Sequence, residues 1–320
     1  MGRCKFLILL TFAIIVPSSA FADTTYSFQT VINPADPSFT ALNGINNSNT
    51  IAGYTGDGTI VPNLGFNLTL PNSFTPENFP GGVQTQVIGI NASGNTAGFY
   101  VDSAGNTNGF VKIGSVFATV DNPLGPGFTQ LLGLNNSGVA VGYYMDASSV
   151  QHAFTVIGTT FTGLDPSLPS NIGAQATGID SAGDLTGFYL DAAGNSHGFV
   201  IKGGLLSLVN VPGAVSTEVL GINNNGDVVG FYLDSSLQSH GFVFDMLTNT
   251  FQIVDDPSSA GTSVINGIND LGDLVGFYTD GAGNTDGFVA TPNVSTPEPS
   301  SALLLGSGLL AFLRFRRRTS

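Results

Sequence analysis

The chain has 320 residues, 42% of them hydrophobic, with 43 glycines and no tryptophan. Residues 23–296 hold 21 acidic residues against two lysines, Lys112 and Lys202, a formal charge of −19. This charge excludes nucleic-acid binding, which needs lysine and arginine at the phosphates, and the single cysteine, Cys4, excludes a disulfide framework, a cysteine-rich zinc site and a thiol nucleophile.

Residues 1–22 have the three ordered parts of a secretory signal peptide. Arg3 and Lys5 form a basic start, residues 6–16 form an apolar core, and Ala20-Phe21-Ala22 is a small-x-small cleavage site. A short buried helix is the alternative interpretation, and it does not explain the three features in this order. We therefore expect secretion through the inner membrane and a mature chain that begins at Asp23.

From residue 26 onward the sequence repeats a unit of several short strands. Within the unit Gly221–Val243, the runs GIN, DVVGFYLD and HGFV indicate three strands separated by two polar turns. A fourth strand follows in most units and ends near an Asp or Asn and then a proline, as in Phe251–Pro257. The Gly-Ile/Leu-Asn/Asp opening recurs in steps of 45, 44, 45, 43 and 46 residues, at Gly44, Gly89, Gly133, Gly178, Gly221 and Gly267.

The first and last units are incomplete in complementary ways. The last unit stops after its third strand, and the N-terminal segment Tyr26–Val31 supplies a fourth strand without the other three. Together they complete a sixth four-stranded sheet, which the alternative architecture, a linear solenoid, does not require. The sequence therefore predicts an all-β six-bladed β-propeller of four-stranded antiparallel blades over residues 23–294, closed by the N-terminal strand.

Three repeated positions indicate how each blade packs. The turn between the first two strands contains a glycine, such as Gly94, as expected for the left-handed bulge position after a type I turn. The second strand carries a glycine, such as Gly187, that permits close approach of another backbone. The third strand carries a phenylalanine, such as Phe199, that we expect to be a packing anchor.

After Val294 the composition changes to that of a tail at residues 295–320. A stiff polar spacer contains Pro297, Glu298 and Pro299, and residues 302–313 form an apolar run. This run is short for a transmembrane span, so we expect transient anchoring in the inner membrane. A basic cluster, which would hold this end on the cytoplasmic side, follows as Arg314, Arg316, Arg317 and Arg318.

The order of these three parts resembles the PEP-CTERM sorting signal of Gram-negative bacteria. The resemblance implies processing by an exosortase, a membrane transpeptidase-like protease, and production alongside exopolysaccharide. It also implies a mature form at the outer surface or in the extracellular matrix. The repeats are similar to the HAF-type repeats of bacterial extracellular proteins, on the motif His152-Ala153-Phe154.

Each of the three histidines follows an aspartate by six residues, which places the two side chains opposite each other at the base of a hairpin. An acid–base or metal pair in each blade is one interpretation. The other is a turn whose Asp accepts hydrogen bonds from the backbone or the imidazole. Asn108 and Asp286 replace the histidine in two other units, which weakens the case for a shared chemical role. The pairs are Asp146 and His152, Asp191 and His197, and Asp234 and His240.

Three loops in this position are acidic and rich in oxygen atoms, so calcium is the one cofactor that the sequence suggests. Their spacing departs from that of an EF-hand, and ordinary turns are the alternative explanation. The candidate calcium or ligand residues are Asp102 and Asn106, Asp191 and Asn195, and Asp280 and Asn284.

The sequence contains no nucleophile elbow, phosphate-binding Gly-Lys loop or zincin helix, so we assign no catalytic residue. One hypothesis is a secreted non-enzymatic scaffold associated with exopolysaccharide, whose partners are the secretion machinery and an exosortase. The alternative is a polysaccharide-active lyase or hydrolase on the same fold, since acidic pairs are plentiful. The similarity of the repeats favours the scaffold, because only the first unit departs, by a one-residue insertion near Asn63–Phe66.

Overall fold

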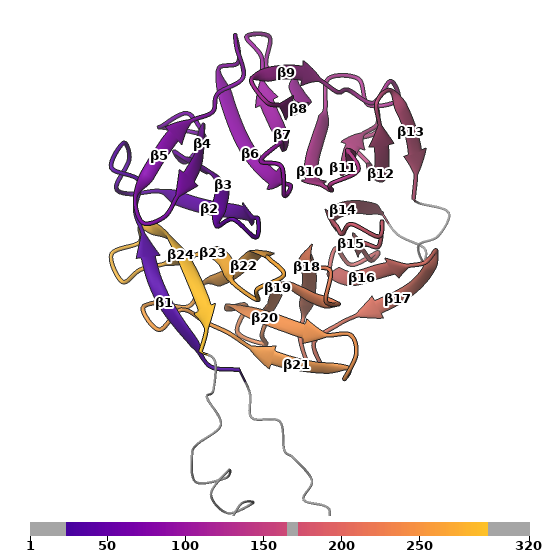
Figure 1. Cartoon of the computed structure of the whole chain (residues 1–320). Coiled ribbons are helices and arrows are strands. Elements are labelled where there is room, and N and C mark those ends of the chain that lie inside the picture. Colours follow the sequence, from indigo (N-terminus) through magenta and orange to yellow (C-terminus); the bar gives the residue numbers. More distant parts are fainter. Residues whose placement is uncertain (1–23, 165–171, 294–320) are drawn as a thin grey trace, which may run out of the picture.

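The computed structural model describes residues 24–164 and 172–293 of the chain. Within these ranges, 24 strands form six four-stranded antiparallel sheets that stand as blades around a common axis (Figure 1). This arrangement confirms the all-β six-bladed propeller. The described ranges contain no helix that could cross a bilayer. The signal peptide expected at 1–22 and the tail at 295–320, with its Pro-Glu-Pro and arginine residues, lie outside the described residues.

The first strand of each blade lines the centre of the ring (Figure 1). Blades 1 to 5 consist of β2–β5, β6–β9, β10–β13, β14–β17 and β18–β21, and blade 6 combines β22–β24 with β1. Neighbouring first strands contact each other around the whole ring. These strands are β2 (Thr40–Ile45), β6 (Gln84–Ile90), β10 (Thr129–Leu134), β14 (Gly173–Ile179), β18 (Ser216–Ile222) and β22 (Ser263–Ile268).

The other three strands of each blade follow outward in chain order, except in blade 6. The second strands are β3 (Thr50–Thr55), β7 (Thr96–Val101), β11 (Val139–Met145), β15 (Leu185–Leu190), β19 (Asp227–Leu233) and β23 (Leu274–Thr279). The third strands are β4 (Leu64–Thr69), β8 (Thr107–Ile113), β12 (Gln151–Ile157), β16 (Ser196–Lys202), β20 (Ser239–Asp245) and β24 (Thr285–Pro292). The fourth strands, which form the outer edges, are β5 (Ser73–Pro76), β9 (Val116–Thr119), β13 (Thr160–Gly163), β17 (Leu205–Val209), β21 (Thr250–Ile253) and β1 (Tyr26–Val31).

Blade 6 is closed by the N-terminal strand, as the incomplete first and last units predict. β1 pairs antiparallel with β24 over six residue pairs, from Tyr26 opposite Pro292 to Val31 opposite Gly287. Figure 1 shows the two strands side by side, with the start of β1 and the end of β24 at the same edge of the ring. The described chain therefore begins and ends in one blade.

A glycine in the second strand makes room for the phenylalanine of the third. In blade 3, Gly142 lies opposite Phe154, whose side chain is fully buried. A Cβ at Gly142 would lie 1.9 Å from the carbonyl oxygen of Gln130 on the first strand. The same close approach occurs in every blade, so the predicted roles of this glycine and this phenylalanine are confirmed. The other pairs are Gly53 and Phe66, Gly98 and Phe110, Gly187 and Phe199, Gly230 and Phe242, and Gly276 and Phe288.

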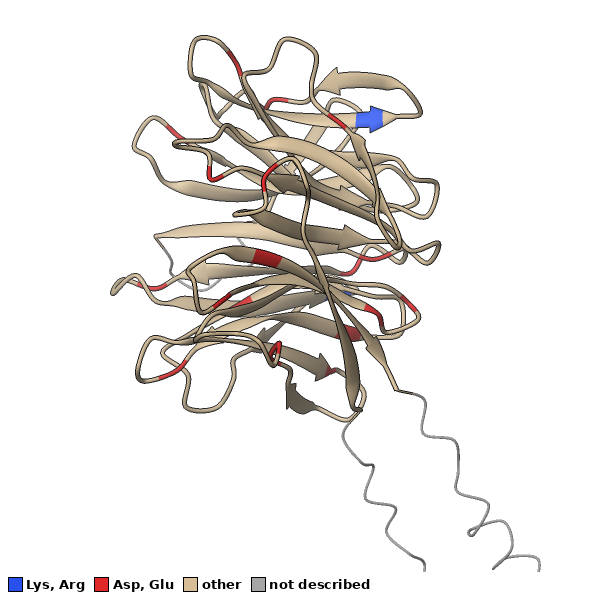
Figure 2. Ribbon diagram, turned by 90° about the vertical axis from the view of Figure 1, so that its left-hand side faces the viewer, with Lys and Arg blue, Asp and Glu red and all other residues tan. Residues whose placement is uncertain are grey.

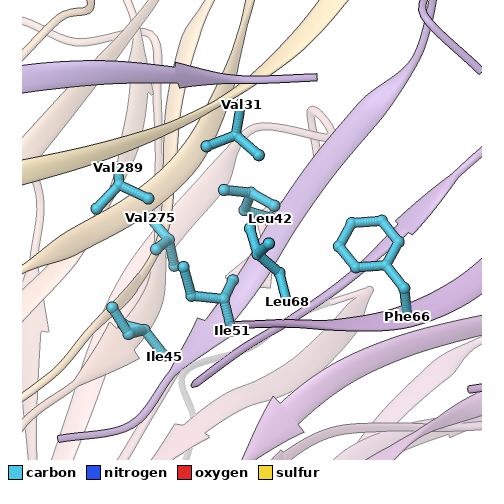
Figure 3. Close-up of a cluster of buried hydrophobic side chains, with 8 residues drawn as sticks. All are labelled: Val31, Leu42, Ile45, Ile51, Phe66, Leu68, Val275 and Val289. Atoms are coloured by element: carbon cyan, nitrogen blue, oxygen red, sulfur yellow. The ribbon is translucent and has the colours of Figure 1, made fainter. Parts of the chain in front are cut away.

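The hydrophobic core lies within and between the blades rather than at one central point. The cluster in Figure 3 joins blades 1 and 6, because Val31, Val275 and Val289 of blade 6 meet Leu42 and Ile51 of blade 1. Burying an aliphatic side chain of this kind contributes about 1.5–3 kcal/mol. Closure of the ring is thus stabilised by apolar packing as well as by the β1–β24 ladder.

The turns between the first and second strands have the expected backbone. Gly94, Gly138, Gly183 and Gly272 all have positive φ, between 74° and 89°, which glycine adopts at little cost. Blade 1 departs from the other blades more than the sequence suggested. Its β3–β4 connection spans residues 56–63, whereas the equivalent β7–β8 connection spans only residues 102–106.

Candidate functional site

The aspartates and histidines of blades 3 and 4 meet across their hairpins. Asp146 accepts hydrogen bonds at Oδ1 from the backbone N–H groups of Ser148 (2.8 Å) and Val150 (3.0 Å). Its Oδ2 lies 3.2 Å from His152 Nε2. In blade 4, Asp191 Oδ2 lies 3.1 Å from His197 Nε2. The spacing therefore located these pairs correctly, and each aspartate also shapes its own turn.

Blade 5 has a different arrangement, because its histidine faces two carboxylates. His240 Nε2 lies 3.7 Å from Asp234 Oδ2, while Nδ1 lies 2.7 Å from Oδ2 of Asp255, two residues after the fourth strand. The hydrogen bond with Asp255 raises the pKa of His240, and the charge of Asp234 adds to the effect. Asp255 was not identified from the sequence, because its contact with His240 depends on the β20–β21 pairing.

A tyrosine of the second strand stacks on the histidine in each of these blades. The ring centroids of Tyr144 and His152 are 4.9 Å apart, with an interplanar angle of 22°. Tyr189 with His197 and Tyr232 with His240 repeat the contact at 5.2 Å. In blade 6 the tyrosine is Tyr278, opposite the buried Asp286. The histidine is therefore one member of a packed hairpin rather than an isolated polar group.

The three acidic loops considered for calcium are closed by their own hydrogen bonds. The side-chain amides of Asn106, Asn195 and Asn284 donate to Oδ2 of the aspartate four residues earlier, at 2.9, 3.1 and 2.9 Å. Such a bond presents nitrogen to the carboxylate, whereas calcium would require the amide oxygen.

These hydrogen bonds also affect the acidity of the loop carboxyls. The Asn106 and Asn284 side chains lower the pKa of Asp102 and Asp280, and His197 is the main cause of a lowered pKa at Asp191. No group of three or more metal-binding residues occurs among residues 24–164 and 172–293. The geometry thus corresponds to the turn interpretation, and calcium binding stays a prediction.

A cavity of about 540 Å³ lies on the propeller axis, lined by residues from the first strands of all six blades. Each first strand contains a β-bulge, which turns one side chain out of the regular ladder. The six residues at these bulges line the cavity, and three of them are polar and three aliphatic. They are Asn43, Ile88, Leu132, Thr177, Leu220 and Asn266.

A ring of glycines follows the bulge residues along the channel. A Cβ at Gly89 would lie 3.0 Å from Cα of Gly133, and Gly178, Gly221 and Gly267 are similarly close to the next blade. The repeated glycine of the Gly-Ile/Leu-Asn/Asp opening therefore lets six first strands approach each other around the axis. A second cavity of about 110 Å³ lies on the other side of these glycines, at the turns between the first and second strands of the blades.

The last residue of this opening, Asn or Asp, links the blades to one another. Asn46 Nδ2 donates to the carbonyl oxygen of Asn91, Asn91 to that of Asn135, and Asn135 to that of Asp180, each at 3.1 Å. Asn223 Nδ2 donates to Asn269 at 3.1 Å. Asn269 Nδ2 then donates to the carbonyl oxygen of Asn46 at 3.3 Å, which links blade 6 back to blade 1. We call these six positions the asparagine belt.

The asparagine belt has one gap and was not anticipated from the sequence. Asp180 has no side-chain N–H in its ionised form, so the link from blade 4 to Asn223 in blade 5 is missing. The sequence does contain the residues of the belt, as the third residue of each Gly-Ile/Leu-Asn/Asp opening. Its meaning depends on the contact between neighbouring blades, which only the closed ring supplies.

The charges of the propeller are almost entirely negative. Figure 2 shows acidic residues distributed over the ribbon, many of them in loops, with basic residues rare. Both lysines in the described residues have acidic partners: Lys112 contacts the buried Glu77, and Lys202 Nζ lies 3.9 Å from Asp184 Oδ2. Such a surface attracts cations and repels anionic partners.

Several solved propeller structures are similar to this chain. A protein assigned as TolB from Agrobacterium tumefaciens matches with a TM-score of 0.57 and 12% identity, covering 85% of this chain and 100% of that chain. A mutant Aleuria aurantia lectin in complex with Fucα1-6GlcNAc matches with a TM-score of 0.50 and 14% identity, covering 81% of this chain and 97% of that chain. A further Aleuria aurantia lectin structure, described as a six-bladed β-propeller, has a TM-score of 0.50 and 13% identity, and covers 86% of this chain and 97% of that chain. At these identities the likeness concerns the fold alone.

The clearest comparison concerns the C-terminal end. A comparison with curated proteins finds no match. Residues 295–318, however, match the PEP-CTERM protein-sorting motif. This motif implies processing by an exosortase and export to the cell surface or the extracellular space. The chain is thus a six-bladed β-propeller that carries a PEP-CTERM protein-sorting motif at its C-terminal end.

Proposed function

We propose that this protein is a non-enzymatic propeller scaffold at the outer surface or in the extracellular matrix of a Gram-negative bacterium, associated with exopolysaccharide. The single observation that carries this proposal is the PEP-CTERM match at residues 295–318. The signal-peptide pattern at residues 1–22 supports it from the other end of the chain. The formal charge of −19 over residues 23–296 would keep the released propeller soluble.

The uniformity of the blades supports a scaffold over an enzyme. The polar groups that a repeated active site would use are already engaged in turns, as in the bonds of Asp146 and Asp191 to their own loops and histidines. An exposed Asp–His contact of this kind contributes little to stability, because water screens it. These pairs therefore fit a structural role in the hairpins.

The sorting part of the proposal is tested at the Pro-Glu-Pro motif. Replacing Pro297, Glu298 and Pro299 together with alanine should trap the longer precursor in the inner membrane. Replacement of Ser295 and Thr296 with alanine, which keeps Pro297, Glu298 and Pro299, provides the matched control and should leave release unchanged. Mass spectrometry of the wild-type protein outside the cell should find a C-terminus near the motif. An intact chain through Ser320 on that released protein would contradict the proposal.

The scaffold part is tested by assays for activity and for polysaccharide association. Protein recovered from the medium should release neither reducing ends nor unsaturated sugars from the exopolysaccharide of its host, and should co-sediment with that polysaccharide. Reproducible turnover that a single carboxylate substitution abolishes would establish the enzyme alternative. Co-sedimentation in calcium and in chelator, with Asp191→Asn as the variant, would show whether the acidic loops take part through calcium.

A further inference from the structure

Several polar side chains of the axial cavity already form hydrogen bonds that hold neighbouring blades together. Asn43 Nδ2 donates to the carbonyl oxygen of Val87, and Thr177 Oγ1 donates to that of Val219. The amide of Asn266 likewise donates to a backbone carbonyl, so these bulge residues are committed to holding blades together. The remaining bulge residues are aliphatic. Asn266 keeps its Oδ1 as an acceptor, and the other polar side chains left for a ligand are Gln151 of blade 3, Gln175 of blade 4 and Glu218 of blade 5.

Glu218 is the one carboxylate that lines this cavity. It lies on β18, and its Oε1 accepts a hydrogen bond from Ser196 Oγ at 2.8 Å. Within the described ranges, its Oε2 has no hydrogen-bond partner and neither lysine reaches it, because Lys112 and Lys202 contact other acids. Burial raises the pKa of Glu218, as expected for a carboxylate without a counter-ion. The cavity thus contains an acid whose charge is not compensated.

Two glutamines extend the polar wall beside Glu218. Gln175 Nε2, on the neighbouring first strand β14, donates to Gln151 Oε1 at 3.1 Å. This bond leaves the Gln175 carbonyl oxygen as an acceptor and the Gln151 amide as a donor. Both glutamines line the same cavity as Glu218. Of these three side chains, Glu218 and Gln175 therefore offer acceptors to the cavity and Gln151 offers a donor.

Aliphatic side chains lie among these polar groups, since Leu220 is only two residues from Glu218 on β18. Ile88, Leu132 and Leu220 project from the bulges of three blades and are only partly buried. A volume of about 540 Å³ falls within the range of small-molecule sites. A ligand that fills this space needs an apolar body and a polar end that donates hydrogen bonds.

We propose that the axial cavity binds a small organic cation, a protonated amine with a compact apolar body. The ammonium group pairs with Glu218, Gln175 offers a second acceptor, and the body packs against Leu132 and Leu220. This binding site is additional to the sorting and scaffold roles and does not depend on them.

Three other ligand classes fit this cavity less well. Calcium takes six to eight oxygen ligands, and much of the wall here is aliphatic. An anion would be repelled by Glu218 and by the negative charge of the whole domain. A neutral polyol would leave the buried carboxylate without a compensating charge.

The proposal is tested with two probes of the same shape and different charge. Isothermal titration calorimetry on protein recovered from the medium should give saturable binding of cyclohexylammonium, with one site per chain. Cyclohexanol should bind at least tenfold more weakly. Equal affinity for the two probes, or no saturable binding of cyclohexylammonium, would overturn the proposal.

Matched variants locate the site. Glu218→Gln keeps the size of the side chain and an acceptor for Ser196 Oγ, and should weaken cyclohexylammonium binding at least tenfold. Leu220→Trp should weaken it independently by filling the cavity. Asp234→Asn, which removes a carboxylate in a hairpin turn away from the channel, should bind like the wild type. Unchanged affinity in both Glu218→Gln and Leu220→Trp would place the amine elsewhere and refute the proposal.

Discussion

A single side chain determines whether blades 4 and 5 are linked through the asparagine belt. Asp180 occupies the position at which Asn135 and Asn223 donate to the next blade. Its Oδ1 accepts from the backbone of Ala182 and Asp184, so the turn itself is formed normally. The missing element is a side-chain N–H directed at the carbonyl oxygen of Asn223.

Asp180→Asn should therefore stabilise the propeller. The substitution keeps the Oδ1 acceptor and adds the missing donor, and one net hydrogen bond contributes about 1 kcal/mol. Thermal or urea unfolding should show this gain. Asn135→Asp is the matched control, because it opens a second gap and should lower stability by a similar amount. A gain from both substitutions, or from neither, would contradict the role of the asparagine belt.

His240 gives blade 5 a dependence on pH. Its pKa in the folded protein is raised by Asp255 above the ordinary value of about 6.5. A raised folded pKa contributes stability that is fully present below about pH 6.5 and is lost as the pH rises through the folded value. The loss of stability in His240→Asn should therefore be larger at about pH 5.5 than at about pH 8.5.

Urea unfolding of the wild type and the variant at both pH values checks this prediction. The difference between the two proteins isolates His240 from the other titrating groups. Asp255→Asn should reduce the same pH dependence, since it removes the main cause of the shift. A difference between wild type and His240→Asn that is independent of pH would show that the Asp255 contact does not stabilise the charged ring.

At the scale of the strands, the second-strand glycine should be indispensable. In Gly142→Ala, the new Cβ would lie 1.9 Å from the carbonyl oxygen of Gln130, so β10 and β11 must move apart. We expect a loss of about 3 kcal/mol in the free energy of unfolding, at the upper end of the range for overpacking.

Gly163→Ala in the same blade is the control for this prediction. Gly163 lies on the outer strand β13, and a Cβ there would meet no atom within 4 Å. That substitution should be neutral or slightly stabilising, because alanine restricts the unfolded chain. Similar losses from the two variants, measured by urea unfolding, would indicate a general intolerance of blade 3 rather than the close approach at Gly142.

The strands themselves could be predicted because each carries its signal locally. The alternation of turns, the repeated Gly142-type glycine and the Phe154-type anchor occur within one unit, so a single period suffices to find them. The asparagine belt, the Asp255–His240 contact and the Glu218 cavity could not be predicted in the same way. Each depends on which strand or blade lies next to a residue, and that follows only from the sheet pairing and the closed ring.

At the scale of the whole molecule, the ring combines an acidic surface with closure by one strand. The outer strands β5, β9, β13 and β21 have only four residues each, and such short edges limit pairing with other chains. β24, with eight residues, is longer and is covered by β1. The N-terminal strand thus protects the edge that would otherwise be the most exposed to aggregation.

Deletion of residues 24–33 should therefore abolish the monomeric folded protein. It removes the six β1 residues that pair with β24, including Val31, which is buried in the cluster shared by blades 1 and 6. At about 1 kcal/mol per net hydrogen bond and about 1.5–3 kcal/mol for the valine, the loss approaches the total stability of a typical domain. Size-exclusion chromatography with light scattering, together with circular dichroism, should find aggregates.

A synthetic peptide of residues 24–33 added during refolding should restore monomeric protein, since it can re-form the β1–β24 ladder. A truncated chain that stays monomeric and melts at the wild-type temperature would show that the ring does not need its closing strand.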